Sequence, residues 1–202
     1  MDSAPGIIAS IQDAARDMGL PVPGRDAASH VIGLGLQDSL RTAVPSLAPE
    51  NYMDFAQAYR RHFRARQDSM ELFGGVRELL DQLRGEGRRL AVATGKSRRG
   101  LDHALNLTGL VGHFVASRCA DETSPKPDPA MLLALMDELE LNASDLLMVG
   151  DTSHDLEMAK NAGVDALAVT YGAHPGGALR ALAPRACVET VVELRRWLTA
   201  NA

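Results

Sequence analysis

The chain has 202 residues, enough for one large domain or two small domains with a hydrophobic core. Hydrophobic residues make up 46% of it and charged residues 23%, which is typical of a globular protein. The net charge of -5 argues against a nucleic-acid-binding surface, and no apolar run has the length of a membrane span. The N-terminus also lacks the basic and then apolar pattern of a signal peptide.

The two cysteines, Cys119 and Cys187, have neither the spacing of a metal site nor that of a disulfide framework. Free thiols are usual in a reducing compartment, so we expect a cytoplasmic protein. The composition therefore leads us to expect no nucleic-acid partner and no membrane partner.

Residues 1–71 have a helical pattern and no strand signal. Two prolines and a glycine at positions 21–24 interrupt the pattern. A second helical stretch is expected over 25–44, where Gly33 and Gly35 mark either a tight helix break or a substrate-specificity loop. We therefore expect a small, all-helical domain over 1–71.

Helices and strands alternate from residue 72 onward. Strands are expected over 89–94, 113–117, 146–149 and 164–170, and a last one at Cys187 and Val188. Helices are expected over 76–84, 101–107 and 129–139, directly after Asp155, and at the end of the chain. Because strands joined by helical crossovers form a parallel sheet with helices on both faces, the sequence predicts an α/β domain over 72–202.

Two carboxylates follow the apolar run that ends at Gly150. Asp151 comes directly after it, and Asp155 lies one helical turn further on, at the start of a helical pattern. Ligands of open α/β sheets bind at the carboxyl ends of the strands, and Mg²⁺ is typically held there by one or two carboxylates and by phosphate oxygens. The alternative is that Asp151 is a turn residue and Asp155 a first-turn acid favoured by the helix dipole.

A small hydroxyl-bearing turn follows the earlier strand. Thr94, Gly95 and Ser97 lie between that strand and the next helix, so a hydroxyl and helix N–H groups can converge on an anion. The alternative is that Thr94 and Ser97 only cap the helix.

A lysine stands in a proline-rich segment between the two motifs. Lys126 lies between Pro125 and Pro127, which restrict the backbone and present the cation in a defined place. An isolated lysine of this kind is often a surface residue. The order of hydroxyl, lysine and paired acids along the chain favours a site for a phosphate and a metal ion.

In that order, these residues resemble the motifs of the haloacid dehalogenase (HAD) superfamily, in the branch that is similar to phosphoglycolate phosphatase. Thr94 stands at the second motif of the family, Lys126 at the third, and Gly150, Asp151 and Asp155 at the fourth. The resemblance covers nearly the whole chain. It implies a Rossmann-type parallel sheet core, with the helical residues 1–71 as a mobile cap domain.

The resemblance also implies roles for these residues. Thr94 and Gly95 would bind phosphoryl oxygens, and Lys126 would neutralise charge on the phosphoryl group and on the nucleophile. Asp151 and Asp155 would form the Mg²⁺ site, with Asp155 in a supporting position. Thr94, Lys126, Asp151 and Asp155 are thus the expected catalytic residues of a phosphatase that hydrolyses a small phosphomonoester.

The first motif of the family, Asp-x-Asp-Gly-Thr, is missing from this chain. Asp2 and Ser3 match only the residues that follow it, so the nucleophile that forms the aspartyl-phosphate is expected upstream of Met1. The chain as given is then expected to be inactive and to lack the central strand of the sheet. It should rearrange to close the gap, borrow a strand from another copy, or be poorly stable.

Two further readings stay open. Within the family, the substrate could be pyrophosphate or a sugar or nucleotide phosphate in place of a phosphoglycolate-like metabolite. From a different class, the chain could be a catalytically dead binding protein. The oligomeric state is not predicted by the sequence.

Overall fold

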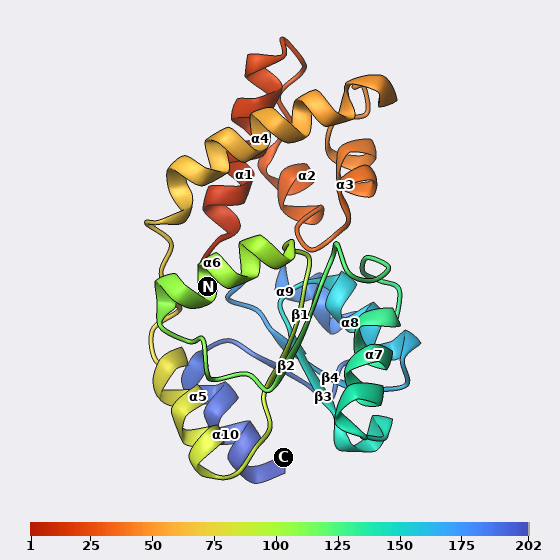
Figure 1. Cartoon of the computed structure of the whole chain (residues 1–202). Helices are drawn as coiled ribbons and strands as arrows, with labels where there is room; N and C mark the ends of the chain where they lie inside the picture. The colour runs from red at the N-terminus through yellow and green to blue at the C-terminus, as the bar shows by residue number, and fades with distance from the viewer. Residues whose placement is uncertain (202) are drawn as a thin grey trace. The chain divides into compact units, whose positions relative to one another are not determined.

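The computed structural model describes residues 1–201 (Figure 1). The chain divides into two compact units, Met1–Glu71 and Leu72–Ala202. None of the helices in the described part is long and apolar enough to cross a membrane.

The first unit contains only helices among its described residues. They are α1 (Ala4–Asp17), α2 (Arg25–His30), α3 (Leu36–Ala43), the short 3-10 helix η1 (Pro49–Asn51) and α4 (Tyr52–Gln67). The continuous helical stretch expected over 25–44 is wrong, because the chain turns between α2 and α3. Gly33 has a φ of 97° there, a left-handed conformation that glycine adopts without strain, so a helix break is observed and a substrate-specificity role of this loop stays a prediction.

Helices α1 and α4 pack against each other in the core of the first unit, to which α2 and α3 also contribute buried residues. The small residues Ala14 and Ala15 of α1 are fully buried. They allow α1 to pack closely against α4, where Phe55 and Ala58 belong to the same cluster. Two ion pairs join the same helices at the rim, one between Arg66 and Asp13 and one between Arg61 and Asp17, which is 42% exposed. The helix pair is thus held by an apolar seam with charged side chains at its edge.

The second unit has the expected alternation of strands and helices. Its strands are β1 (Ala91–Thr94), β2 (Ala116–Cys119), β3 (Leu147–Gly150), β4 (Asp165–Val169) and β5 (Ala186–Val188). Its helices are α5 (Val76–Gly85), α6 (Arg98–Thr108), α7 (Ala130–Leu139), the 3-10 turn η2 (Ala143–Asp145), α8 (Ser153–Asn161), α9 (Gly176–Arg180) and α10 (Val191–Asn201). All strand pairs are parallel, which confirms the predicted α/β class.

The first four strands begin one to three residues later than predicted, and the largest shift is that of β2. The expected strand over 113–117 is β2, Ala116–Cys119, and His113 instead lies in a turn that its N–H closes onto the carbonyl of Leu110. The register pairs Ala91 with Ala116 and Thr94 with Cys119. Because each residue of β2 pairs with a residue of β1, β2 begins opposite the first residue of β1. The short helix α9 was not expected from the sequence.

The five strands form two separate sheets. One has the order β1-β2 and the other β3-β4-β5, so within residues 1–201 β1 pairs only with β2, and β3 pairs only with β4. Val149, in the middle of β3, is 38% exposed, although strands of a covered parallel sheet are normally buried. The division agrees with the expected absence of a central strand from the described residues.

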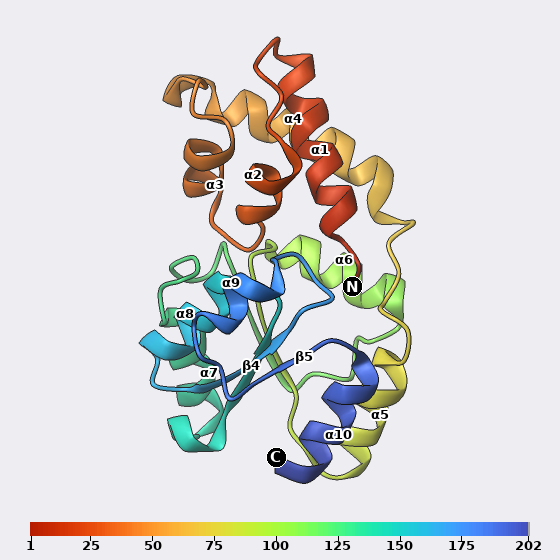
Figure 2. The ribbon, with the colours of Figure 1, turned by 180° about the vertical axis from the view of Figure 1, so that it is seen from behind.

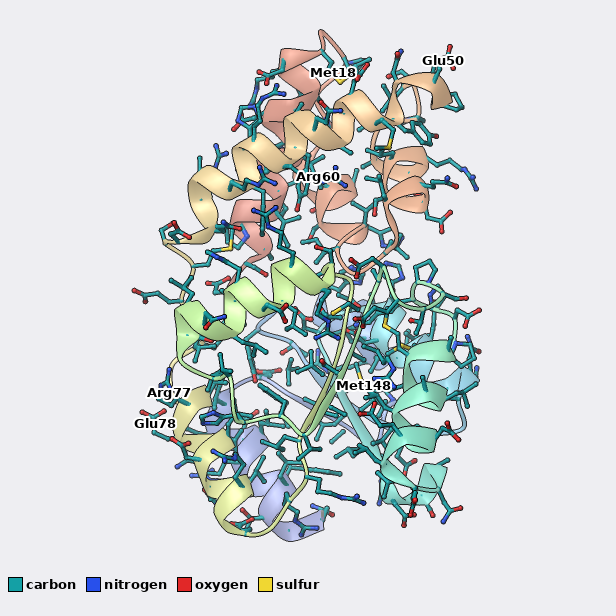
Figure 3. The ribbon with its side chains drawn as sticks, in the orientation of Figure 1. Met18, Glu50, Arg60, Arg77, Glu78 and Met148 are labelled. Carbon is teal, nitrogen blue, oxygen red and sulfur yellow. The ribbon has the colours of Figure 1, made fainter. Side chains whose placement is uncertain are left out.

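Helices cover the strands on two sides (Figures 1 and 2). On one side, α7 and α8 bury Met131, Leu135 and Met158 against Ala93 of β1 and Met148 of β3, which is labelled in Figure 3. On the other side, α5 and α10 bury a second cluster with β4 and β5, which includes Leu79, Leu167, Val188, Val191 and Leu194. The two sheets therefore share the α7 and α8 layer, although no strand among residues 1–201 joins them.

Candidate active site

The residues predicted to carry chemistry meet at one edge of the second unit. Thr94 is the last residue of β1, Asp151 directly follows β3, and Thr170–Pro175 follows β4. Because the strands are parallel, their carboxyl ends lie at the same edge, where ligands of open α/β sheets bind. Lys126 reaches this edge from the loop before α7.

The turn after β1 is closed by its own side chains. The N–H of Lys96 donates to Oγ1 of Thr94 at 3.2 Å, and the N–H of Gly100 donates to Oγ of Ser97 at 3.3 Å. Ser97 is thus the N-cap of α6, which confirms the capping alternative for Ser97, whereas Thr94 accepts from Lys96 before the helix begins. Thr94 and Gly95 are partly buried beside this helix N-terminus, whose dipole favours an anion.

Arg98 joins the start of α6 to the loop after β2. Its Nε and Nη2 donate to the two carboxylate oxygens of Glu122 at 2.7 and 2.8 Å, and its backbone N–H donates to Asp121 Oδ1 at 2.9 Å. The hydrogen bonds from Arg98 outweigh the effect of burial and lower the pKa of Glu122 to about 2. This pair was not singled out from the sequence, because Arg98 begins helix α6 and Glu122 lies in a loop 24 residues further along the chain.

Lys126 is buried and bound on two sides. Its Nζ donates to Asp155 Oδ1 at 2.5 Å and to the carbonyl of Ala93 at 3.0 Å, and the residue is only 5% exposed. The surface alternative for Lys126 is therefore wrong. Since Ala93 belongs to β1 and Asp155 to α8, which directly follows β3, the ammonium group links the two sheets next to Thr94.

Asp155 is held by four hydrogen bonds. Oδ1 accepts from Lys126, and Oδ2 accepts from the N–H of Asp151 at 3.2 Å and from the N–H and hydroxyl of Thr152 at 3.1 and 2.8 Å. Burial alone would raise the pKa of Asp155, but the Lys126 ammonium and the Thr152 hydrogen bonds outweigh it and lower the pKa. Four bonds use most of the acceptor capacity of a carboxylate.

Asp151 is also largely removed from water but has a different environment. Its Oδ2 accepts a hydrogen bond from the N–H of Ala173 at 2.9 Å. Burial, and then the negative charge of Asp155, raise the pKa of Asp151. A carboxylate whose charge is destabilised in this way fits a divalent cation, because a bound cation would favour the ionised form.

Glycine is required next to both carboxylates. A Cβ on Gly150 would lie 2.3 Å from Cβ of Asp155, and a Cβ on Gly172 would lie 2.1 Å from Oδ2 of Asp151. Both distances are far below van der Waals contact, so a side chain at either position would displace an acid. Gly150 was expected as part of the motif, whereas Gly172 belongs to a segment for which the sequence left a pocket lining and a plain turn equally open.

Three further groups at the site, which the sequence did not identify, make hydrogen bonds to its residues. They are the hydroxyl of Thr152, the N–H of Ala173 and the side chain of His174, whose Nδ1 accepts from the N–H of Ser153 at 3.0 Å. Ala173 and His174 directly follow a strand that ends at the same edge of the sheet, which is their signal in the sequence. Asp2 lies in the first unit, where its N–H donates to the carbonyl of Glu71.

The sequence matches the haloacid dehalogenase-like hydrolase family over residues 1–169, so the chain belongs to this family. It is 36% identical over 200 residues to the "Probable phosphatase IndB" of Dickeya dadantii, covering 96% of this chain and 86% of that protein. It is 32% identical over 197 residues to a phosphoglycolate phosphatase of Pseudomonas putida, covering 94% of this chain and 72% of that protein. Both of these relatives are thus named as phosphatases, and they are similar to this chain over most of their length.

The chain is also similar to a protein kinase and to a solved hydrolase structure. Over 173 residues the chain is 35% identical to the tyrosine-protein kinase PtkA of Mycobacterium tuberculosis, covering 85% of this chain and 58% of that protein. The crystal structure of a hydrolase from Pseudomonas syringae matches with a TM-score of 0.90 at 20% identity, over 100% of this chain and 94% of that one. The structural match supports the fold alone.

Proposed function

We propose that the second unit is the catalytic core of a Mg²⁺-dependent phosphomonoesterase acting on a small phosphorylated metabolite, such as phosphoglycolate. The observation that carries the proposal is the buried Lys126–Asp155 pair, which lies next to Asp151 and contacts the strand that ends in Thr94. A buried ammonium, one buried acid and one partly buried acid at the carboxyl edge of a parallel sheet are suited to a phosphate and a metal ion together.

Asp151 is the proposed direct ligand of the metal ion. Asp155 is proposed to support Asp151 by accepting a hydrogen bond from its backbone N–H. Both oxygens of Asp155 already accept hydrogen bonds, whereas the charge of Asp151 is destabilised by burial and by Asp155. Bound Mg²⁺ would supply positive charge to the phosphoryl oxygens and orient the group. The chain's own part is to hold the Asp151 carboxylate in one position, through the hydrogen bond from the N–H of Ala173.

Thr94, Gly95 and Lys126 are the proposed phosphate-binding residues. The Thr94 hydroxyl and the Gly95 backbone lie at the turn before α6, where a hydrogen bond from Lys96 fixes the hydroxyl. The Lys126 ammonium is held by Ala93 and Asp155 and so needs no reorganisation when the negative charge of a substrate arrives. Together they stabilise charge on the transferred phosphoryl group.

The nucleophilic aspartate is proposed to arrive on a further strand between β1 and β3. Each of these strands pairs on one edge only within the described residues, and both pack on the same α7 and α8 layer. A parallel strand added there would end beside Lys126, where a carboxylate could attack phosphorus to form an aspartyl-phosphate. The 202-residue chain by itself is then inactive.

The test compares the 202-residue chain with a version extended at its N-terminus by a strand ending in Asp-x-Asp-Gly-Thr. Turnover of p-nitrophenyl phosphate and of phosphoglycolate is measured with and without Mg²⁺. The matched control replaces the first aspartate of the added motif by asparagine. Mg²⁺-dependent turnover by the extended chain alone supports the proposal, whereas a folded extended chain that turns over no phosphate ester favours a binding protein.

A panel of substrates separates the remaining phosphoryl-transfer functions. Pyrophosphate, sugar phosphates and nucleotides are assayed beside phosphoglycolate with the extended chain. The similarity to PtkA adds one candidate, transfer of a phosphoryl group to tyrosine, which is tested with radiolabelled ATP and a tyrosine-containing peptide. Label on the peptide without release of phosphate from small esters would favour the kinase activity.

A further inference from the structure

The loop between β4 and α9 binds Asp151 through two consecutive backbone groups. The N–H of Ala173 donates to Asp151 Oδ2 at 2.9 Å, and the N–H of His174 donates to the backbone carbonyl of Asp151 at 3.1 Å. Ala173 lies 22 residues after Asp151 in the sequence, so the two residues are brought into contact only by the tertiary structure. It holds both the carboxylate and the peptide group of the same residue.

The side chain of His174 adds a third point of attachment. Its Nδ1 accepts a hydrogen bond from the N–H of Ser153, the first residue of α8, at 3.0 Å. An N–H in the first turn of a helix has no acceptor within that helix, so His174 supplies the acceptor. Because Nδ1 accepts this bond, it carries no proton, and the proton of the neutral ring is on Nε2.

The His174 ring has little freedom to leave this position. The residue is 3% exposed, and its ring meets the ring of His154 edge-on, with centroids 5.1 Å apart and planes at 80°. Gly172 completes the loop, because a Cβ there would lie 2.1 Å from Asp151 Oδ2. The backbone of the loop therefore lies directly against the carboxylate.

We propose that His174 and Gly172 are positioning residues that orient Asp151 toward the metal ion, His174 through the start of α8 and Gly172 by close backbone approach. The inference rests on the proposed function, in which Asp151 is the metal ligand. Groups that orient a ligand from outside the metal's own coordination typically change metal affinity 10- to 100-fold when they are lost. His174 itself contacts neither metal nor substrate in this assignment.

Metal affinity of the purified chain tests the proposal, with Mn²⁺ as the probe and the electron paramagnetic resonance signal of the free ion as the readout. His174→Gln removes the acceptor at Nδ1, whereas His174→Asn places its side-chain oxygen close to that position. We expect about 10- to 100-fold weaker binding for His174→Gln and for Gly172→Ala, and recovery to within about threefold in His174→Asn. His103→Gln, at an exposed histidine of α6, is the control and binds as the unmodified chain does.

The outcomes separate the two proposals. Loss of binding in Asp151→Asn, together with unchanged binding in His174→Gln and Gly172→Ala, overturns the positioning role and leaves the metal site standing. Unchanged binding in Asp151→Asn overturns the proposed function and this inference with it. If a variant fails to fold, the ¹⁵N resonances of His174 in the unmodified chain decide: an unprotonated Nδ1 supports the inference, and a protonated Nδ1 contradicts it.

Discussion

Lys126 Nζ lies 2.5 Å from Asp155 Oδ1, and each of the two side chains is only 6% exposed. Asp155 Oδ2 accepts three further hydrogen bonds, from the N–H of Asp151 and from the N–H and the hydroxyl of Thr152. Removing one member of a buried ion pair leaves the other charge unbalanced in a medium of low polarity. The stability of the site therefore depends on both residues together.

Lys126→Met should lower the free energy of unfolding by about 3–5 kcal/mol, because it leaves the buried Asp155 carboxylate without its cation. Urea unfolding followed by circular dichroism measures the change. Lys160→Met, at an exposed lysine of α8, is the matched control and should change stability by no more than about 0.5 kcal/mol. Equal effects of the two substitutions would contradict the importance of the buried pair.

Gly150→Ala should destabilise the second unit by about 1–3 kcal/mol, because the new Cβ would lie 2.3 Å from Cβ of Asp155 and would force α8 or β3 to move. Gly177→Ala, in α9, is the comparison, since no atom lies within 4 Å of a Cβ built there. That variant should be neutral or more stable by less than about 1 kcal/mol. Thermal unfolding of both proteins checks the difference, and a neutral Gly150→Ala would refute the close approach.

Glu122 should contribute to the acid sensitivity of the chain. Because Arg98 lowers the pKa of Glu122 from 4.5 to about 2, its stabilising contribution is present above about pH 4.5 and is lost as the pH falls toward 2. The side chain is one-third exposed, so solvent screens part of the effect. Urea midpoints across this range should fall less steeply in Glu122→Gln than in Glu78→Gln, a substitution at an exposed carboxylate of α5 (Figure 3). Identical pH profiles would exclude the Arg98 pair as the cause.

The two thiols should differ in reactivity. Cys119 is fully buried, and burial raises its pKa to about 11, so little thiolate forms at about pH 8. Cys187 is partly exposed, and we expect iodoacetamide to alkylate it first. Mass spectrometry of the digested protein measures both rates, with the urea-unfolded chain as the control in which the difference disappears. Faster labelling of Cys119 would contradict the burial of this residue.

The sequence by itself determined the elements and the residues of the candidate site. The apolar run before Gly150, the turn after Thr94 and the prolines around Lys126 are local patterns, and local patterns report on helices, strands and loop ends. They predicted the α/β class, which is confirmed, and the set Thr94, Lys126, Asp151 and Asp155, whose chemical roles stay predictions. The position of β2 was missed by three residues, because the register with β1 decides where that strand begins.

Only the tertiary structure decided how those residues are held. Lys126 contacts Asp155 across 29 positions of the sequence, and Ala173 contacts Asp151 across 22. No periodicity or spacing encodes such contacts, because they depend on which strand ends are brought to one edge and on how the loops between them fold back. The same holds for the separation of β1 from β3, which is a property of strand pairing and of the helices that cover both sheets.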